Sequence, residues 1–514
     1  KMAKAVIGIM GNMNPHLRDV PDFQHKLWDQ LFIMSNFKLD VDSTFEKPQQ
    51  EVLEQKPDRL AYPQRNPKYR FYGNNIKSMI NVALNWEDGE FYEEEPLHKE
   101  MERVFDICHG CRRCVSLCTT FPTLFDLIDE SSTMEVDGVA KEDYAKVVDK
   151  CYLCDMCYMN KCPYVPPHEF NIDFPHLMLR AKAQKFKKGE TKFRDKLLSS
   201  TDALGKLSAI PVVVQTMNAV NKNKSTRVLM EKALGIHKDR KLPTYAGKTF
   251  RSKMSESVVA SPQDGERTPG KVAVFVTCYV NYNEPNIGDD LFKVLEHNKV
   301  PVVAVQKEAC CGMPKLELGD LASVKTLKEK NIPQMAKYVR DGFALMTSVP
   351  SCTLMFKQEL PLMFPDDEEV KLVAKAMFDP FEYLILRGRD GLLNLDFKVP
   401  LGQVSYHVPC HLRVQNIGLK TKEMLERVPD TVVKTVERCS GHDGTWGVKK
   451  EYFDDSMKIG RPVFRQMSEE LPQYISSDCA IAATHIVQGI EAKQDLGEVK
   501  KRHPLTLLRI AYGL

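Results

Sequence analysis

The chain has 514 residues, of which 43% are hydrophobic, so it is long enough for three or four domains with sizeable cores. No apolar stretch reaches the roughly 18–20 residues that a membrane-spanning helix needs, and the apolar run at 5–10 is too short for a secretory signal. The net charge is only +3 and no nucleic-acid-binding motif accompanies it, which argues against a nucleic-acid partner.

Residues 1–100 are predicted to form an irregular N-terminal extension. Proline interrupts any long helix there, at Pro48, Pro57, Pro63 and Pro67. The extension ends in an acidic stretch at 86–102, which reads WEDGEFYEEEPLHKEME. We expect it to wrap around the rest of the chain or to bind a partner.

Two cysteine runs dominate residues 101–176. The first has the spacing C-x2-C-x2-C-x3-C and the second has C-x2-C-x2-C-x4-C followed by proline; together they hold eight of the 15 cysteines. A cubane iron–sulfur cluster needs four converging thiolates, and in two-cluster ferredoxins the fourth cysteine of each run serves the other cluster. The spacing therefore predicts two [4Fe–4S] clusters, one held by Cys108, Cys111, Cys114 and Cys162 and the other by Cys151, Cys154, Cys157 and Cys118.

Helical patterns at 121–128 and 144–148 separate the runs, so residues 101–176 are predicted to form an α-helical bicluster ferredoxin domain. Structural zinc is the main alternative, but zinc sites usually pair two C-x2-C units or combine cysteines with histidines. A disulfide framework is disfavoured because a chain of this length needs no covalent staples. The metal-binding spacing instead favours a reducing compartment, which predicts a cytoplasmic protein.

Residues 177–268 are predicted to be a basic helical segment and a linker. Residues 180–253 hold 19 Lys and Arg against 5 Asp and Glu, a balance of +14 that leaves −11 for the rest of the chain. Helical patterns occur at 178–188 and 226–234, and 255–270 has the Ser, Pro and Gly content of a linker. This separation of charge predicts docking on an anionic surface, either a protein partner or the inner face of a membrane, with a solvated helical face as the alternative.

Strands and helices alternate after the linker. Strands are predicted at 271–278, 300–305 and 343–349 with helices at 287–297 and 322–340. The alternation recurs after residue 400, with strands predicted at 403–408, 431–436 and 474–477. Such alternation predicts parallel sheets with crossover helices, and hence a tandem duplication with copy one at 269–398 and copy two at 399–514. Open sheets of this kind bind ligands at the carboxyl ends of their strands, where most of the remaining seven cysteines occur.

These remaining cysteines carry a family resemblance. Copy one has ACCGMP at 309–314, copy two has YHVPCHLR at 406–413, and LMEKALGIHKDRKLP at 229–243 precedes both. Together with the two ferredoxin runs, these motifs resemble the cysteine-rich CCG domains of the heterodisulfide reductase family, and the order of the domains is similar to that in the iron–sulfur subunits of anaerobic glycerol-3-phosphate dehydrogenases. The resemblance covers roughly residues 101–514. It implies an α/β fold with tandem parallel-sheet CCG domains beside the α-helical ferredoxin domain.

A full motif of this family reads C…CCG…CxxC, and its five cysteines bind a noncubane [4Fe–4S] cluster or, in other members, a simpler one. Neither copy keeps all five, because Val349 replaces one cysteine in copy one and Ser440 and Ala482 replace two in copy two. Buried cysteines without metal are therefore the alternative to a cluster in each copy. The resemblance implies one or two further clusters, with candidate ligands Cys278, Cys310, Cys311 and Cys352 in copy one and Cys410, Cys439, Cys479 and His442 in copy two.

The leading prediction is an iron–sulfur electron-transfer subunit of an oxidoreductase complex, which passes single electrons between a partner donor and a quinone, thiol/disulfide or protein acceptor. The chain has no Gly-rich fingerprint for a nicotinamide or flavin, so a separate flavin subunit or another redox protein is the expected partner, and a rubrerythrin-like non-haem iron protein is a further candidate. The alternatives are a cluster-based disulfide reductase of the heterodisulfide type and an iron–sulfur scaffold or redox sensor. Whether the chain is itself an enzyme stays open.

Overall fold

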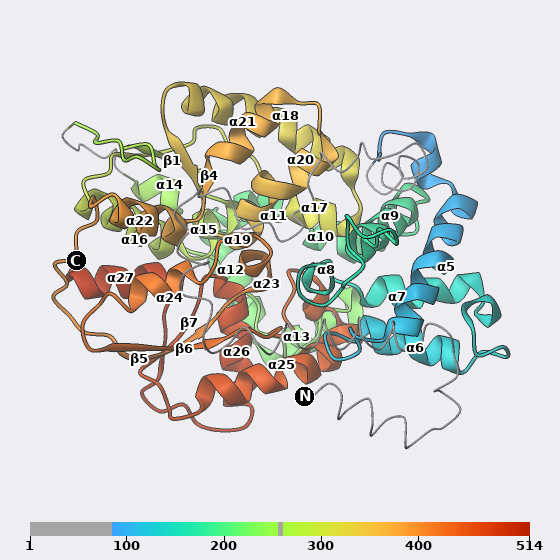
Figure 1. Ribbon diagram of the computed structural model, residues 1–514. Coiled ribbons are helices and arrows are strands. Elements are labelled where there is room, and N and C mark those ends of the chain that lie inside the picture. Colours follow the sequence, from blue (N-terminus) through green and yellow to red (C-terminus); the bar gives the residue numbers. More distant parts are fainter. Residues whose placement is uncertain (1–84, 255–260) are drawn as a thin grey trace, which may run out of the picture. The chain divides into compact units, whose positions relative to one another are not determined.

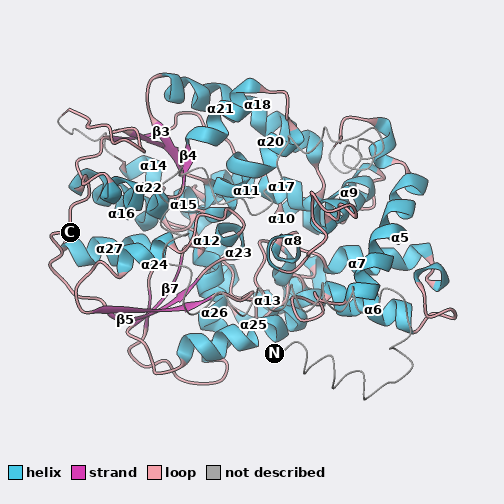
Figure 2. Ribbon diagram, viewed as in Figure 1, coloured by secondary structure: helices cyan, strands magenta, loops and turns pink. Residues whose placement is uncertain are grey.

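The computed structural model describes residues 85–254 and 261–514, so most of the predicted extension and the start of the linker lie outside the described residues. The strands gather into two groups, both in the C-terminal half, and helices make up most of the remaining regular structure (Figure 2). Figure 1 gives the labels of the elements.

The part of the chain that holds the two ferredoxin runs is helical. Phe105, Phe121, Tyr144 and Phe174 form its core, with the rings of Phe121 and Phe174 4.8 Å apart. Two of its helices confirm the helical patterns predicted between the runs, while the predicted boundaries at 100 and 176 fall inside the first and last helix. These helices are α5 (Glu94–Cys111), α6 (Thr120–Asp129), α7 (Tyr144–Lys150), α8 (Met156–Asn160) and α9 (Phe174–Lys187).

The first residues of the acidic stretch pack against copy one. The indole nitrogen of Trp86 donates a hydrogen bond to the carbonyl of Met363 over 3.2 Å, and Glu87 pairs with Lys325 at 2.7 Å. Arg180 of the basic segment is fully buried and donates to the carbonyl of Phe91 over 2.7 Å. Residues 86–91 therefore lie between the helical part and copy one.

Short helices follow α9 and lead to the linker. Asn223 begins the helix at Lys224–Leu234 by accepting hydrogen bonds from the backbone amides of Ser225 and Thr226, and Gly235 ends it in the left-handed conformation that glycine adopts without strain. The helices are α10 (Phe193–Leu198), α11 (Thr201–Ser208), α12 (Pro211–Lys222), α13 (Lys224–Leu234) and α14 (Phe250–Lys253).

Copy one contains a parallel four-stranded sheet in the order β2-β1-β3-β4. Val272 of the central strand pairs with Val302 on one side and Ala344 on the other. The strands are β1 (Val272–Val274), β2 (Val302–Ala304), β3 (Ala344–Met346) and β4 (Met377–Phe378). The helices are α15 (Cys278–Tyr282), α16 (Pro285–His297), α17 (Met313–Leu318), α18 (Leu321–Arg340), α19 (Pro350–Leu354), α20 (Leu360–Met363), α21 (Glu368–Ala376) and α22 (Pro380–Arg389), with a π-helical turn at Met355–Glu359.

Copy two repeats this arrangement in the order β6-β5-β7-β8, again with parallel strands. The strands of the two copies thus have the same order, as expected for the predicted duplication. The strands are β5 (Gly402–His407), β6 (Thr431–Val436), β7 (Tyr474–Ser477) and β8 (Lys500–Lys501), and the helices are α23 (Cys410–Arg413), α24 (Lys420–Leu425), α25 (Phe453–Ser468), α26 (Ala480–Glu491) and α27 (Pro504–Tyr512).

Helices cover both faces of each sheet, and the strands of copy one are apolar throughout, as expected for a parallel sheet that is buried on both faces. In copy one, Val272 and Val274 pack with α16 and α22, while Ala273 packs with α18 and α21. In copy two, α24 and α27 lie on one face of the sheet and α25 and α26 on the other (Figure 1). The loops that carry the cysteines lie at the carboxyl ends of the strands.

Candidate iron–sulfur sites

The four cysteines predicted for the first cluster line one small cavity of about 20 Å³. Cys108 and Cys111 lie on the last turn of α5, and Cys162 follows α8, with its amide bonded to the carbonyl of Cys157. Burial raises the pKa of Cys114 to about 12 and that of Cys162 to about 11. Thiols held together in this way are costly to ionise without a counter-charge, and a bound cationic metal centre supplies one.

Cys118, Cys151, Cys154 and Cys157 come together as a second set. Burial raises the pKa of both Cys118 and Cys151 to about 12, and neighbouring thiols add to the shift in each case. Cys157 has Cys118, Cys151 and Cys154 as electrostatic neighbours. Cys118 belongs to the first run in sequence and the other thiols to the second, so this grouping has the crossed pattern that the spacing predicts. Which thiols ligate which cluster stays a prediction.

The four cysteines of copy one form a continuous series of contacts. Cys278 hydrogen-bonds to Cys310, which bonds to Cys311, which in turn bonds to Cys352. They follow the carboxyl ends of β1, β2 and β3, as expected for ligands of an open parallel sheet. The hydroxyl of Thr201 lies 3.4 Å from the sulfur of Cys278 and 3.5 Å from that of Cys310.

The thiols of copy two are arranged differently from the prediction. Cys410 hydrogen-bonds to Cys439 as expected, but its other thiol partner is Cys154 of the second ferredoxin run. Cys479 lies at the start of α26, where its sulfur accepts hydrogen bonds from the amides of Ile481 and Ala482. The structure thus joins Cys154, Cys410 and Cys439, while the sulfur of Cys479 hydrogen-bonds to the first turn of its own helix.

The histidines near copy two are hydrogen-bonded. Arg240 is buried and directs its guanidinium nitrogens to the Nδ1 atoms of His442, at 2.5 Å, and of His485. Burial and this positive charge lower the pKa of His442. His411 bonds through Nδ1 to the hydroxyl of Ser351 at 2.8 Å. His442 as a ligand stays a prediction, and only its Nε2 would be available for that role.

A cavity of about 400 Å³ lies between the two copies. Its lining includes Cys154 together with cysteines from both copies, and apolar side chains from α10 to α13 cover it. Sequence reasoning missed three carboxyl groups in its wall, Glu317, Asp443 and Asp478. Burial raises the pKa of Asp443 to about 7, and burial together with the Asp443 carboxylate raises the pKa of Glu317 well above its usual value. The only sequence sign of Asp443 was its place in the loop CSGHDGTWG.

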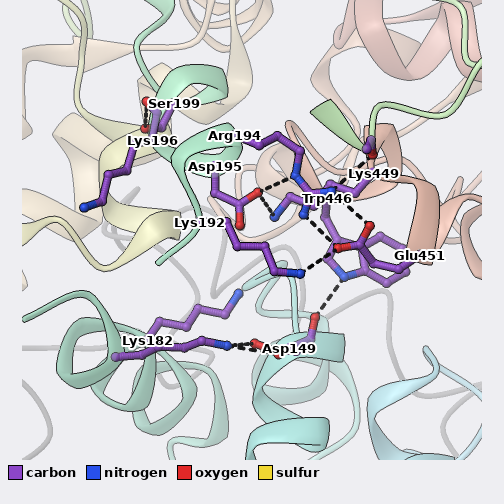
Figure 3. Close-up of polar contacts among 12 residues, drawn as sticks. Asp149, Lys182, Lys192, Arg194, Asp195, Lys196, Ser199, Trp446, Lys449 and Glu451 are labelled. Carbon is purple, nitrogen blue, oxygen red and sulfur yellow. Dashed lines mark hydrogen bonds and ion pairs between the residues drawn. The ribbon is translucent and has the colours of Figure 1, made fainter. Parts of the chain in front are cut away.

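Polar contacts fix the helical part and the basic segment to copy two (Figure 3). Arg194 of α10 donates two hydrogen bonds to the carboxylate of Glu451, at 2.7 and 3.0 Å, and Lys449 pairs with Asp195 at 3.2 Å. The indole nitrogen of Trp446 donates to the carbonyl of Asp149 over 3.1 Å. Cationic side chains of the basic segment therefore form ion pairs within the chain.

Tyr152 connects the second ferredoxin run to copy two. Its hydroxyl shares a hydrogen bond with the sulfur of Cys439 at 3.2 Å, and its ring lies 5.0 Å from that of Trp446. Sequence reasoning gave this tyrosine no role, because its meaning depends on a contact between segments almost 300 residues apart.

The donor set fits iron–sulfur chemistry. Within 85–254 and 261–514, no group of three or more His, Cys, Asp or Glu side chains is arranged to hold a single metal ion. Iron–sulfur clusters instead take one thiolate on each of several irons, and all 15 cysteines of the chain are free thiols. The buried sets described above consist of thiols from adjacent loops, which is the chemistry such clusters require.

Comparisons with known proteins agree with this geometry. A family described as "Cysteine-rich domain" (CCG) matches residues 272–357 and 404–486, and one described as "Citrate utilization protein B Fer4-like domain" matches 101–188. Residues 1–104 match a "Domain of unknown function (DUF4290)", although the sequence alone had offered no resemblance there.

Three similar proteins illustrate the range of the family. A subunit of the anaerobic glycerol-3-phosphate dehydrogenase of Escherichia coli is 30% identical over 346 residues, which cover 66% of this chain and 82% of that protein. A subunit of the fumarate reductase (CoM/CoB) of Methanothermobacter marburgensis is 26% identical over 48% of each chain. Lactate utilization protein A of Bacillus cytotoxicus is 29% identical over 41% of this chain and 87% of its own. The chain therefore belongs to the family of CCG-domain iron–sulfur proteins that includes this subunit of anaerobic glycerol-3-phosphate dehydrogenase.

Proposed function

We propose that the chain is an iron–sulfur electron-transfer subunit of an oxidoreductase complex, with a flavin subunit or another redox protein as its donor. Iron–sulfur clusters supply single-electron transfer when bound, and the proposal takes two [4Fe–4S] clusters in the ferredoxin runs and one in each CCG copy. Membership of the family supports it, because several relatives are named as subunits of dehydrogenases or reductases.

The observation that carries the proposal is the continuity of the thiol sets. The first set adjoins the second, since Cys157 has both Cys114 and Cys151 as electrostatic neighbours. The second set adjoins copy two through the contact of Cys154 with Cys410. The cavity then brings copy one next to copy two. If the clusters had a purely structural role, the thiol sets would not need to lie next to one another in a continuous series.

The cavity is the proposed binding site of the acceptor. Its walls carry apolar side chains such as Leu204, Met217 and Ile236, which suit a lipophilic molecule. Reduction of a quinone to a quinol, or of a disulfide to two thiols, takes up two electrons and two protons. Burial raises the pKa of Asp443 to about 7 and that of Glu317 above its usual value, so these two groups are the proposed proton donors at their carboxyl oxygens.

The helices that cover the cavity favour a quinone as the electron acceptor. Helices α11 to α13 line the cavity on one side and leave Leu207, Val212 and Leu229 exposed on the other, at 53%, 75% and 64%. Exposed apolar side chains among lysines are typical of a surface that docks on an anionic bilayer. Among the described helices no single one is long and apolar enough to cross a bilayer; only a pair bent by 112°, Thr201–Ser208 with Val212–Lys222, has the length and composition as a broken span. The proposed location is therefore the cytoplasm, with peripheral contact at the inner membrane.

Disulfide reduction by the chain itself is the second candidate. It is favoured by the unbroken series of four thiols in copy one, which opens onto the same cavity as the protonated carboxyl groups. Neither copy has the complete five-cysteine motif, so a quinone acceptor ranks first.

Rapid mixing separates these functions. The anaerobic chain is reduced chemically and mixed with a water-soluble quinone, with a small disulfide or with buffer, while the visible absorbance of the clusters is followed. We expect fast reoxidation by the quinone, slowed in Asp443→Asn. Fast reoxidation by the disulfide with production of free thiol would favour the reductase instead. If neither acceptor reoxidises the clusters, and a flavoprotein donor does not reduce them, the electron-transfer proposal fails in favour of a scaffold or sensor.

A further inference from the structure

The histidines that line the large cavity differ in how their ring nitrogens are used. They are His407, His411 and His442. His407 engages both nitrogens, Nδ1 with a serine hydroxyl at 3.1 Å and Nε2 with a backbone carbonyl at 3.0 Å. His411 likewise has two partners, a serine hydroxyl of copy one at 2.8 Å and the backbone of the second ferredoxin run. His442 bonds through Nδ1 to Arg240, and within 85–254 and 261–514 its Nε2 has no hydrogen-bond partner.

The contact with Arg240 determines which nitrogen of His442 carries the hydrogen. A guanidinium group only donates hydrogen bonds and has no lone pair with which to accept one. Arg240 directs one nitrogen to Nδ1 of His442 at 2.5 Å, so Nδ1 must be the acceptor. Burial and the positive charge of Arg240 also lower the pKa of His442, which keeps the ring neutral. A neutral imidazole whose Nδ1 accepts a hydrogen bond carries its single N–H at Nε2.

His485 has the same contact with Arg240 but a different use for its second nitrogen. Arg240 donates to Nδ1 of His485, so this ring also carries its hydrogen at Nε2. That nitrogen lies 3.5 Å from the hydroxyl oxygen of Ser456, whose own hydrogen is donated to the carbonyl of Gly441 over 2.6 Å. His485 therefore donates inside the fold, and it is not among the residues that line the cavity. Of the two histidines, His442 is the one whose donor is left for an occupant of the cavity.

The charge of Arg240 strengthens this donor. Arg240 is buried, and no carboxylate in the described parts of the chain pairs with it. Hydrogen bonds in series polarise one another, so a guanidinium that donates to Nδ1 makes the Nε2–H of His442 a better donor. Such a donor stabilises the negative charge that collects on a carbonyl oxygen when its molecule takes up electrons. The same hydrogen occupies the position that a metal ion would need on Nε2, so this form of His442 does not suit a metal ligand.

We propose that His442 binds the electron acceptor, and that its Nε2–H donates a hydrogen bond to a carbonyl oxygen of a quinone in the cavity. Arg240 is the positioning residue that fixes the tautomer of His442. This role replaces the ligand role that the sequence predicts for His442. The inference rests on the proposed function, in which the cavity holds a quinone. Asp443 lines the same wall directly after His442, so the carbonyl oxygen is held on the side of the cavity that carries a proposed proton donor.

Binding and infrared measurements on the full chain test this assignment. The chain is prepared anaerobically with oxidised clusters, so that a quinone binds without being reduced, and the probes are naphthoquinone and naphthalene, which has the same rings without carbonyl groups. The matched variants are His442→Asn and His485→Asn, since an asparagine oxygen can still accept from Arg240 but the shorter side chain does not reach the position of Nε2. We expect His442→Asn to weaken the binding of naphthoquinone about tenfold and that of naphthalene less than about twofold. His485→Asn should leave both affinities unchanged.

The carbonyl stretching frequency of bound naphthoquinone, identified by isotope labelling, reports the hydrogen bond directly. In the wild type it should lie below the value in an apolar solvent, and in His442→Asn it should return toward that value. A purely structural role of His442 would not move this frequency.

Unchanged affinity and carbonyl frequency in His442→Asn, with naphthoquinone bound by the wild type, would overturn the role of His442 and leave the proposed function standing. If the wild type neither binds naphthoquinone nor is reoxidised by a quinone after reduction, the proposed acceptor site fails and the inference fails with it. Loss of iron from His442→Asn but not from His485→Asn would show that His442 is a metal ligand. A carbonyl frequency in the wild type equal to that in an apolar solvent would also contradict the proposal, and this measurement needs no variant to fold.

Discussion

Two neighbouring arginines near the first thiol set differ in how far an acidic partner neutralises their positive charge. Arg112 and Arg113 lie side by side in the first ferredoxin run, but Arg112 donates hydrogen bonds to Asp129 at 2.9 Å and stacks over the ring of Phe125. Its charge is thus largely balanced by a carboxylate. Arg113 lines the small cavity and acts on the thiol of Cys162, whose pKa it lowers against the larger effect of burial.

This contrast predicts which arginine tunes the first cluster. A nearby positive charge favours the more negative reduced state, so Arg113→Gln should lower the reduction potential of the first cluster, by on the order of 10–30 mV because the side chain is exposed and screened. Arg112→Gln is the matched control and should change the potential less. A redox titration followed by EPR measures both, and an equal or larger shift in Arg112→Gln would contradict the role given to Arg113.

The crossed grouping of the ferredoxin thiols leads to a second residue-level prediction. Cys108 has Cys162 as its strongest electrostatic thiol neighbour, although Cys162 belongs to the other run in sequence. Cys162→Ser should therefore damage the cluster of Cys108, Cys111 and Cys114 and leave the second cluster intact, while Cys118→Ser should do the reverse. Resolved EPR spectra of the two variants provide the measurement. Damage by Cys162→Ser confined to the Cys151–Cys157 cluster would refute the crossing.

Asp379 gives a pH-dependent prediction. It caps α22 and is buried, and burial followed by the charge of Asp478 raises its pKa to about 8. Because the unfolded-state pKa is about 3.9, its contribution to stability is fully present below that pH and is lost as pH rises toward 8. Asp379→Asn keeps an oxygen that can cap the helix but cannot ionise. We expect it to flatten the fall in stability between about pH 5 and about pH 8, by up to about 1.4 kcal/mol per pH unit.

Asp367 is the matched control for this experiment, because it caps α21 in the same manner but its pKa is lowered, by the hydrogen bond to Lys328 against the opposing effect of burial. Its stabilising contribution is already complete above pH 4, so Asp367→Asn should leave the slope above pH 5 unchanged. Denaturation midpoints across this pH range, recorded anaerobically on the full chain, are compared. Equal slopes in Asp379→Asn and the wild type would show that Asp379 ionises normally.

At the scale of elements, local sequence predicts the regular parts of the chain and misses what tertiary contacts decide. The strands 431–436 and 474–477 are found with their predicted bounds. The run 271–278 was expected to be one strand, but β1 ends at Val274, and Thr277 turns the chain with φ of 73° and caps α15. The strands β4 and β8 have two residues each and exist only because a neighbouring strand pairs with them. Their sequences carry no periodic pattern to recognise.

The attachment of α10 to copy two gives a prediction at this scale. Arg194 is buried and makes a two-pronged contact with Glu451 and a hydrogen bond to the carbonyl of Gly235. Arg194→Ala should reduce the free energy of unfolding by about 1–3 kcal/mol, since it removes a buried side chain together with its charge-assisted hydrogen bonds. Lys192 pairs with the same Glu451 at 3.7 Å but is 71% exposed, so Lys192→Ala should cost no more than about 0.5 kcal/mol.

Chemical denaturation of the full chain measures both variants, with fluorescence of Trp446 as a local probe because this indole packs at the same junction. Equal midpoints for Arg194→Ala and the wild type would show that the contact contributes no net stability. A large effect of Lys192→Ala would show that the exposed charge matters more than its geometry suggests.

For the whole molecule, the sequence identified the cysteines but could not pair them across domains. Spacing within a run reports the local turn that presents three thiols, and that part of the prediction depends on local geometry alone. The meeting of Cys154 with Cys410 joins loops more than 250 residues apart, and it depends on how the helical part packs on copy two. The cavity carboxyl groups Glu317 and Asp443 could not be recognised for the same reason. The sites that sequence reasoning placed least well are therefore those shared between domains.

The outer surface of α11 to α13 carries the last prediction, which concerns the docking of the whole chain on a membrane. Several cations of the basic segment are used inside the chain, as Arg180, Arg194 and Arg240 show, but Lys222 and Lys224 are exposed beside the apolar side chains of this surface. Each such lysine contributes about 1 kcal/mol near an anionic leaflet, and this contribution weakens as salt screens it. We expect co-sedimentation with vesicles rich in anionic lipid at low salt, and progressive release as the salt concentration rises.

A matched pair of valines tests whether this surface makes the contact. Val212 lies at the start of α12 and is 75% exposed, while Val432 on β6 of copy two is 65% exposed. Val212→Glu places a carboxylate at the proposed interface, where it loses apolar burial and is repelled by the lipid headgroups, so binding should fall about tenfold or more, the equivalent of about 1.4 kcal/mol. Val432→Glu adds the same charge at a distance from this surface and should bind as the wild type does. Equal binding of the two variants would place the contact elsewhere, and no binding of the wild type even at low salt would mean that the basic segment serves a protein partner or only the fold itself.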